Sequence, residues 1–211
     1  MGDKQRHKRL RLLTKELNKD RKRKAQQIDM LCNDLIAAQR GFIKKLKTIS
    51  FTASFYESIV GVIDLNNLLY AAVKQIRRKV DDTKIAFFLR QAESFEMHVF
   101  DSGRPPALGR QQLENCFSQE LTESICQSNK VCTLEDIFEM GLGGDLAALN
   151  GVSAVTIPLG VFGSSSGFML VCRSADDRLT ADEIDNISAV TSGLSQAIAR
   201  CQALSRAAAK D

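Results

Sequence analysis

Residues 84–100 read KIAFFLRQAESFEMHVF, and this stretch decides the fold. Residues 84–91 are an almost continuous apolar run, which is typical of a central strand covered on both faces. In residues 95–100 the side chains alternate in polarity, with the period of a half-buried strand. Residues 92–94 form a turn between the two runs. The stretch therefore predicts an antiparallel hairpin.

The same reasoning places other elements around this hairpin. Asp64 is expected as a helix N-cap, and Thr180 with Glu183 forms a capping box at the start of the last helix. A loop follows the first hairpin at 102–109, and a turn at 163–167 joins the strands of a second hairpin. The expected strands lie at 130–133, 152–159 and 168–173, and the expected helices at 54–80 in two pieces, 111–128, 134–140 and 180–204.

Residues 4–49 contain no proline and a single glycine, and they predict one long helix. Its apolar residues step by three and four, as in a coiled coil. The apolar seam starts in residues 10–17 and becomes polar around Asp20 and Lys24. It resumes in a shifted phase at Leu46 and Ile49. A helix of about 46 residues is near 70 Å long at 1.5 Å per residue. That is too long to bury the seam against its own domain, so we expect a parallel homodimer.

The closing helix has a seam with the same spacing, and we expect it to line up beside residues 28–49 in the dimer. The predicted dimer seam comprises Ile28, Leu31, Leu35, Phe42, Ile184, Ile187, Leu194 and Ile198.

The net charge of +4 conceals two oppositely charged parts. Residues 1–24 hold eleven Lys and Arg against three acidic residues, a net charge of +8, and residues 25–50 add +2. The remainder carries −6. The densest part of this basic arm is Arg21, Lys22, Arg23 and Lys24. Such asymmetry predicts that the two parts do different jobs.

Composition excludes several classes of protein. No run of 18 apolar residues exists, so no membrane-spanning helix is expected. The two histidines and the scattered cysteines give no metal-ligand spacing. Without an export signal the six cysteines are expected as free thiols in a cytoplasmic protein.

The order of elements over residues 54–205 resembles a GAF domain. The resemblance rests on Leu65–Leu69 leading to Lys84–Leu89, on Val155–Leu159 followed by Gly167–Leu170, and on Leu179–Ile184. It implies an α+β fold: a GAF-like antiparallel sheet of about six strands with flanking helices, preceded by the long N-terminal α-helix. The expected domains are a basic coiled-coil helix at 1–50 and the GAF-like domain at 51–211.

The resemblance also implies a regulatory module that binds a small molecule or dimerises. GAF-like domains bind cyclic nucleotides, tetrapyrroles, haem, amino acids and other metabolites, so the ligand or cofactor stays unknown. The middle segment, 102–151, is expected to close a pocket over one face of the sheet. The floor is expected from Phe95, Met97 and Val99 of the second strand, or from its alternate face with His98 and Phe100. The expected lid is Phe117, Leu121, Phe138 and Met140, and Thr156 is a further predicted pocket residue.

Our leading hypothesis is therefore a non-enzymatic sensor that signals through its dimeric coil to a protein partner. The first alternative is a nucleic-acid-associated dimer, in which the basic arm binds phosphates and the GAF-like part only dimerises. The second is an enzyme similar to the free methionine sulfoxide reductases, which use cysteines. That family places its catalytic cysteine just before the strand that ends in Pro-Leu, and residues 146–151 here contain none.

Overall fold

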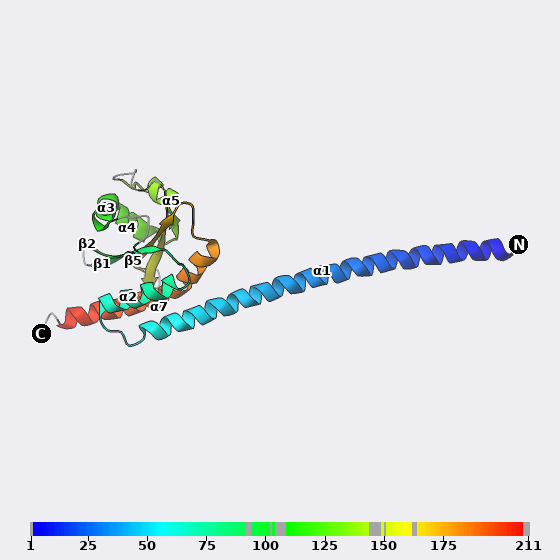
Figure 1. Cartoon of the computed structure of the whole chain (residues 1–211), viewed down its shortest axis with the longest axis horizontal. Helices are drawn as coiled ribbons and strands as arrows, with labels where there is room; N and C mark the ends of the chain where they lie inside the picture. Colours follow the sequence, from blue (N-terminus) through cyan, green and yellow to red (C-terminus); the bar gives the residue numbers. More distant parts are fainter. Residues whose placement is uncertain are drawn as a thin grey trace. The chain divides into compact units, whose positions relative to one another are not determined.

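The computed structural model describes residues 2–91, 94–101, 103, 109–143, 149, 151–161 and 164–208, with the side chains of 2–4, 161 and 164 left out. The chain divides into two compact units, Met1–Ile49 and Ser50–Asp211. The first consists of helix α1, which runs from Gly2 to Ile59 and so enters the second unit without a break (Figure 1).

The second unit is built on one antiparallel sheet. Its five strands are β1 (Lys84–Gln91), β2 (Ser94–Phe100), β3 (Cys132–Thr133), β4 (Val152–Val161) and β5 (Ser164–Ser174). They lie in the order β2-β1-β5-β4-β3. This is the mixed helix-and-sheet class expected from the sequence, with five strands where about six were predicted.

One face of the sheet is covered by α2 (Leu65–Arg77), α7 (Ala181–Ala208) and the last turns of α1 (Figure 1). Asp64 caps α2 by accepting a hydrogen bond from the Asn67 backbone N–H at 2.8 Å. The Thr180–Glu183 capping box opens α7 as predicted. Phe55, Leu69 and Ile198 are among the side chains that form this first core.

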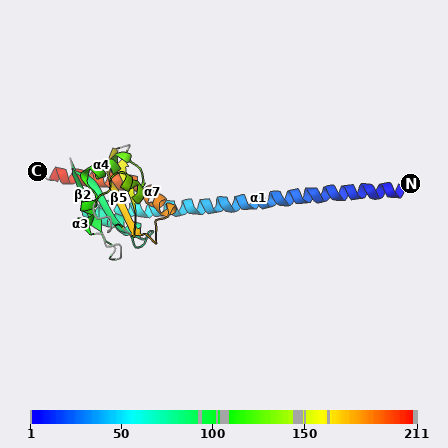
Figure 2. The same ribbon diagram turned by 90° about the horizontal axis from the view of Figure 1, so that it is seen from above.

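The other face carries α3 (Arg110–Cys116), α4 (Gln119–Ser128) and α5 (Leu134–Glu139). Figure 2 views the same layers from above. Side chains from these helices and from the sheet form a second core, separate from the first. The sheet is thus covered on both faces, which explains why β1 is apolar at successive positions.

The predicted single helix at 111–128 is in fact two helices. Phe117 leaves the helical conformation at φ −101° and ψ 83°, and the Ser118 hydroxyl accepts a hydrogen bond from the Leu121 backbone N–H. Since an N-cap serine starts a helix, α4 begins anew at Gln119.

The second hairpin also differs from the prediction. Strand β5 begins at Ser164 and not at 168, and β4 continues through Pro158 to Val161. Strand β3 pairs with β4 only at Val155 and Thr156. Because β4 is an edge strand beyond that point, the missing N–H of a proline is tolerated. Gly163, the remainder of the predicted turn, lies outside the described residues.

Gly167 is required where β5 passes between β1 and β4. Its φ is +146°, and an added Cβ would lie 2.0 Å from the Phe88 carbonyl oxygen. Any other residue would therefore push β5 away from β1.

Candidate functional site

A cavity of about 430 Å³ lies beside β2, where the edge strand meets α3 and α4. This volume is within the range of small-molecule sites in proteins. The cavity is lined by Phe88, Ser94, Phe95, Glu96, Met97, Arg110, Glu114, Phe117, Gln119 and Thr122. It combines an apolar floor with polar groups contributed by the two helices.

The floor follows from strand geometry. Phe95 and Met97 are two residues apart on β2, so they lie on the same face of the sheet. Phe88 pairs with Met97 across the β1–β2 ladder and extends this surface. Phe117, at the end of α3, adds the helix side of the floor.

The rim offers both signs of charge. Arg110 donates from Nε to the Glu114 carboxylate at 2.8 Å, and both side chains are exposed. Thr122 is buried and donates from its hydroxyl to the Ser118 carbonyl at 2.8 Å. A ligand that carries both an acceptor for the guanidinium and a donor for the carboxylate would find partners on this rim.

The centre of the same face is closed by aromatic rings. Phe88 stacks on Phe168 with 4.6 Å between the ring centroids, and Phe117 lies 5.0 Å from Phe88. All three rings are less than a tenth exposed. The open space is thus at the β2 margin of the domain, because the rings fill the position above the middle of the sheet.

A charged contact fixes the outer wall of the cavity to the sheet. Arg90 of β1 donates from Nη2 and Nη1 to the two carboxylate oxygens of Glu123 of α4, at 2.7 and 3.2 Å. The same guanidinium lies over the Phe95 ring, 5.2 Å from its centroid. A ligand that displaces Phe95 would therefore disturb the contact that holds α4 to β1.

Three of the predicted pocket residues line this cavity: Phe95, Met97 and Phe117. Val99, Leu121 and Met140 belong to the same packed layer without lining the cavity. Two others lie at the opposite edge of the sheet. Phe138 lines a different cavity, of about 600 Å³, between α5 and β4. Thr156 is fully buried, and its hydroxyl donates to the Cys132 carbonyl at 3.4 Å.

His98 lies on the other face of the sheet from Phe95 and Met97, because successive residues of a strand point to opposite faces. It lines a cavity of about 380 Å³ with Asp64, Gln202 and Arg206 among others. Its Nε2 is 3.3 Å from a carboxylate oxygen of Glu96. Of the two strand faces that the sequence left open, the cavity beside β2 lies on the face of Phe95 and not on that of His98.

Sequence reasoning missed the polar rim of the cavity. These residues are Arg110, Glu114, Gln119 and Thr122. A single helix at 111–128 places the side chains after Phe117, including Gln119 and Thr122, in the wrong phase. The available signal was Ser118 followed by two helix-forming residues, one of them acidic, which is typical of a new helix start.

The predicted dimer seam falls into two parts with different surroundings. Ile28, Leu31, Leu35 and Phe42 on α1 are 59–69% exposed. On α7, in contrast, Ile187, Leu194 and Ile198 are at most 1% exposed within the first core, and Ile184 packs against that core. The prediction that the α7 residues face a second chain is therefore wrong, since their own domain covers them.

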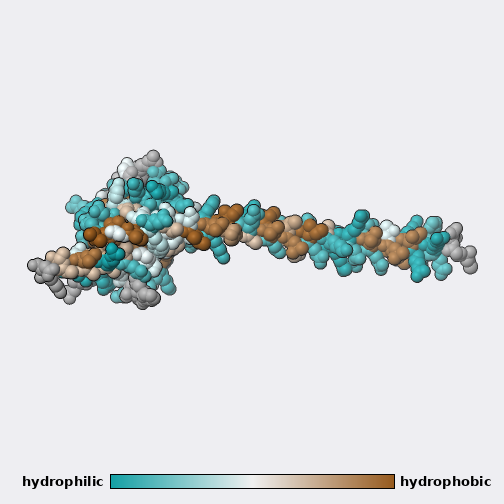
Figure 3. All heavy atoms as spheres, turned by 90° about the horizontal axis from the view of Figure 1, so that it is seen from below, coloured by the Kyte–Doolittle hydropathy of each residue, from teal (hydrophilic) through white to brown (hydrophobic). Residues whose placement is uncertain are grey.

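The basic arm is helical and exposed from Gln5 through Lys24. Figure 3 shows apolar residues along this unit in two stretches, with a hydrophilic stretch between them. The interruption includes Arg21–Lys24. No cluster of metal-ligating side chains occurs in the part of the chain that the structure describes. None of the helices searched over the same residues is long and apolar enough to span a bilayer.

No family model matches the sequence, and no curated protein matches it. Solved structures with the same fold do exist. The GAF domain of an Acinetobacter phosphoenolpyruvate-protein phosphotransferase superposes with a TM-score of 0.55 at 14% identity, covering 76% of this chain and 98% of its own. The GAF domain/HD domain protein of Geobacter sulfurreducens gives 0.54 at 16% identity, covering 67% and 97%.

A third similar structure is a far-red absorbing dark state with bound biliverdin IXa. It gives a TM-score of 0.50 at 15% identity, covering 72% of this chain and 99% of its own. These likenesses show the fold of the chain, which is the fold of GAF domains.

Proposed function

We propose that this chain, which has the fold of GAF domains, is a non-enzymatic regulatory protein of the cytoplasm. It binds a small molecule in the cavity beside β2 and transmits the binding event through a dimeric coil to a protein partner. The observation that carries the proposal is the cavity itself, with its floor of Phe95 and Met97 and its charged rim of Arg110 and Glu114.

The contact between Arg90 and Glu123 supplies a route from the ligand to the fold. Glu123 belongs to α4, which forms one wall, and Arg90 also touches Phe95 on the floor. A ligand that shifts either wall or floor must reorganise this contact. The signal would then reach β1, which pairs with the central strand β5.

The exposed seam of α1 supports the dimer. Leaving Ile28, Leu31 and Leu35 in water is unfavourable, and a second copy of the same seam would cover them. With Ile28 at position a of the heptad, Leu31 falls at position d and Leu35 at the next a.

The cysteines support the non-enzymatic interpretation over a reductase. None of the six forms a disulfide in the part of the chain that the structure describes. Cys116, Cys126 and Cys132 in the middle segment are all buried. Burial raises the pKa of the Cys126 thiol above its usual value, and hydrogen bonds from Ser165 and Arg90 oppose this only in part. A buried thiol with a raised pKa is a poor nucleophile.

Native mass spectrometry of the full chain purified from cells tests ligand binding directly. We expect a retained small molecule in the wild type, and its loss when Gln119→Trp fills the cavity. Glu120→Trp, on the neighbouring exposed position of α4, is the matched control and should retain it. An empty wild-type protein whose melting temperature is unchanged by cyclic GMP, biliverdin or free amino acids would contradict the sensor proposal.

Disulfide cross-linking tests the dimer and its orientation. In a Cys32→Ser background, Leu31→Cys places a thiol at position d, and in a parallel coil the two copies would lie within bonding reach. Oxidation should then give a covalent dimer. Met30→Cys, at the outward position c, should remain monomeric on a denaturing gel. Equal cross-linking of both variants would contradict the parallel register.

A further inference from the structure

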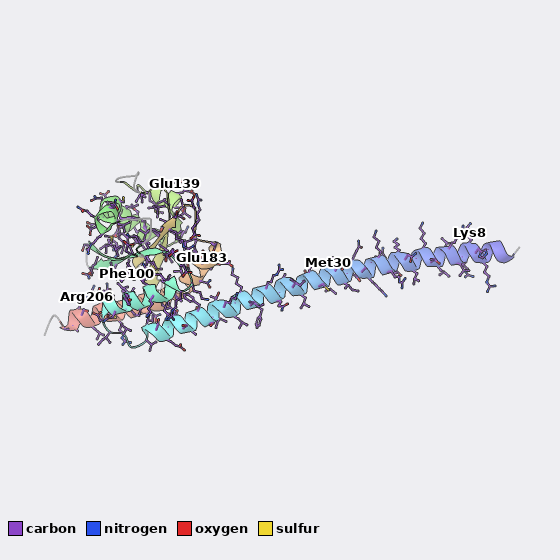
Figure 4. All side chains as sticks on the ribbon, viewed as in Figure 1. Lys8, Met30, Phe100, Glu139, Glu183 and Arg206 are labelled. Carbon is purple, nitrogen blue, oxygen red and sulfur yellow. The ribbon has the colours of Figure 1, made fainter. Side chains whose placement is uncertain are left out.

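The N-terminal unit carries a second periodic pattern besides its apolar seam, and this pattern consists of positive charge. Lys8, Arg11, Lys15, Lys19 and Lys22 follow one another at intervals of three and four residues. At 100° per residue they lie within an arc of about 80°. All five are exposed on a continuous helix, and Figure 4 shows the side chains of this helix projecting outward, with Lys8 near its start. We call these five residues the basic stripe.

The basic stripe lies opposite the apolar seam. In the heptad that places Ile28 at position a, Lys8, Lys15 and Lys22 all fall at position b, which faces outward in a two-stranded coil. Leu10 and Leu17 fall at position d, in phase with Leu31. Lys19 falls at the outward position f, and Arg11 falls at position e, at the margin of the seam. Dimerisation would therefore bury the leucines and leave Lys8, Lys15, Lys19 and Lys22 available.

No ion pair neutralises the stripe among the residues that the structure describes. None of its five residues pairs with a carboxylate among the described residues. Like charges three and four residues apart on a helix repel one another, so a row of five is unfavourable without a partner. A neighbouring row at position c differs, since it reads Arg9, Glu16 and Arg23 and contains its own carboxylate.

The geometry points to the phosphate backbone of double-stranded DNA as the partner: we propose that the basic stripe binds it without regard to sequence. From Lys8 to Lys22 the stripe is about 21 Å long. B-DNA carries one negative charge per about 1.7 Å of axis, which is the dense linear charge that such a row complements. Residues 1–41 contain no aromatic side chain to stack on unpaired bases, which favours a duplex over a single strand.

An anionic membrane fits the same charges less well. A helix on a membrane buries its apolar face in the interface with its basic residues flanking that face. Here the stripe is opposite the leucines, so insertion of Leu10 and Leu17 would turn the stripe toward water. The dimer seam also occupies these leucines.

Fluorescence anisotropy of the full chain with a labelled mixed-sequence duplex DNA of about 30 base pairs tests the proposal. Affinity should fall steeply with salt. Lys15→Gln with Lys19→Gln should reduce the slope of log affinity against log salt by about 1.8 and weaken binding about tenfold or more. Arg9→Gln with Arg23→Gln removes the same charge from position c and should have a clearly smaller effect.

Three results would overturn the proposal: equal losses for the two double variants, tighter binding to a duplex RNA of the same sequence, or binding to phosphatidylserine vesicles without binding to DNA. The proposal of DNA binding goes beyond the proposed function and does not depend on the cavity. The two proposals share only the apolar seam of α1, which disulfide cross-linking tests separately.

Discussion

The two long helices of this chain have the same apolar rhythm and opposite surroundings. On α1, Leu31 and Leu35 are 67% and 69% exposed, whereas on α7 Leu194 and Ile198 are at most 1% exposed. Both sets repeat at intervals of three and four residues. The periodicity thus predicts that the apolar face of a helix will be buried. It does not indicate whether the same chain or a second chain buries it.

Whether a helix is buried by its own chain depends on the elements that surround it. The α7 helix packs on the first face of the sheet beside α2, where the apolar sides of β1, β4 and β5 are available to it. No sheet belongs to the unit that contains residues 28–49. Its seam is therefore open to another chain.

Thiol reactivity gives the sharpest contrast between the two helices. Cys32 on α1 is exposed, whereas Cys201 on α7 is fully buried and its pKa is raised by burial. Since Cys201 can react only after local opening of a core helix, we expect it to be labelled at least about a thousandfold more slowly than Cys32. Mass spectrometry after timed alkylation of the native protein measures both rates. Rapid labelling of Cys201 would contradict the contrast between an exposed α1 and a buried α7.

Truncation of a buried leucine on α7 has the next largest effect. Leu194→Ala should lower the free energy of unfolding by about 2–5 kcal/mol, because it leaves a cavity in the first core. Leu204→Ala lies on the same helix at a position 46% exposed, and its cost should stay below about 1 kcal/mol. Urea denaturation of both variants measures the difference, and equal midpoints would show that α7 is not held by its own domain.

A charged residue in the α1 seam should weaken dimerisation without changing the stability of the domain. Leu35→Lys removes a leucine whose burial in a dimer would contribute about 1.5–3 kcal/mol per chain. We expect a shift toward monomer in sedimentation velocity, with the urea midpoint of the domain unchanged. Asn33→Lys adds the same charge at an outward position and should leave the dimer intact. A loss of domain stability in Leu35→Lys would mean that its own chain covers the seam.

Much of the fold could be predicted from local patterns. The hairpin at 84–100, the Asp64 cap and the Thr180–Glu183 capping box depend on neighbouring residues, and the structure confirms them. What could not be predicted depends on distant contacts. The burial of Leu194 requires knowing which face of the sheet is free for α7.

The candidate site shows the same limit. Phe95 and Met97 were predicted correctly to share a face, because strand alternation is a local rule. The rim residues Gln119 and Thr122 depend on the helix break at Ser118, which the prediction of a single helix at 111–128 does not contain. Alternation places Phe95 and His98 on opposite faces of β2, but it does not show which of the two faces forms a cavity with α3 and α4.

The smallest predicted effect concerns the local hydrogen bonds at the start of α5, which involve neither the rest of the sheet nor a second chain. The Asp136 carboxylate accepts hydrogen bonds from the Thr133 backbone N–H and hydroxyl, each at 2.7 Å, and these bonds lower the pKa of Asp136 below its usual value. A carboxyl whose pKa is lowered on folding stabilises the fold above its unfolded pKa, and the contribution is lost as the pH falls through the folded value. Asp136→Asn should therefore weaken the start of α5 slightly at neutral pH. The difference from the wild type should shrink as the pH falls below the usual aspartate value near 3.9, and it should vanish below the lowered folded pKa. Amide hydrogen exchange across α5 at the two pH values measures it, with Glu135→Gln on the same turn as the control. A difference that persists in acid would mean that the residue acts through packing and not through its charge.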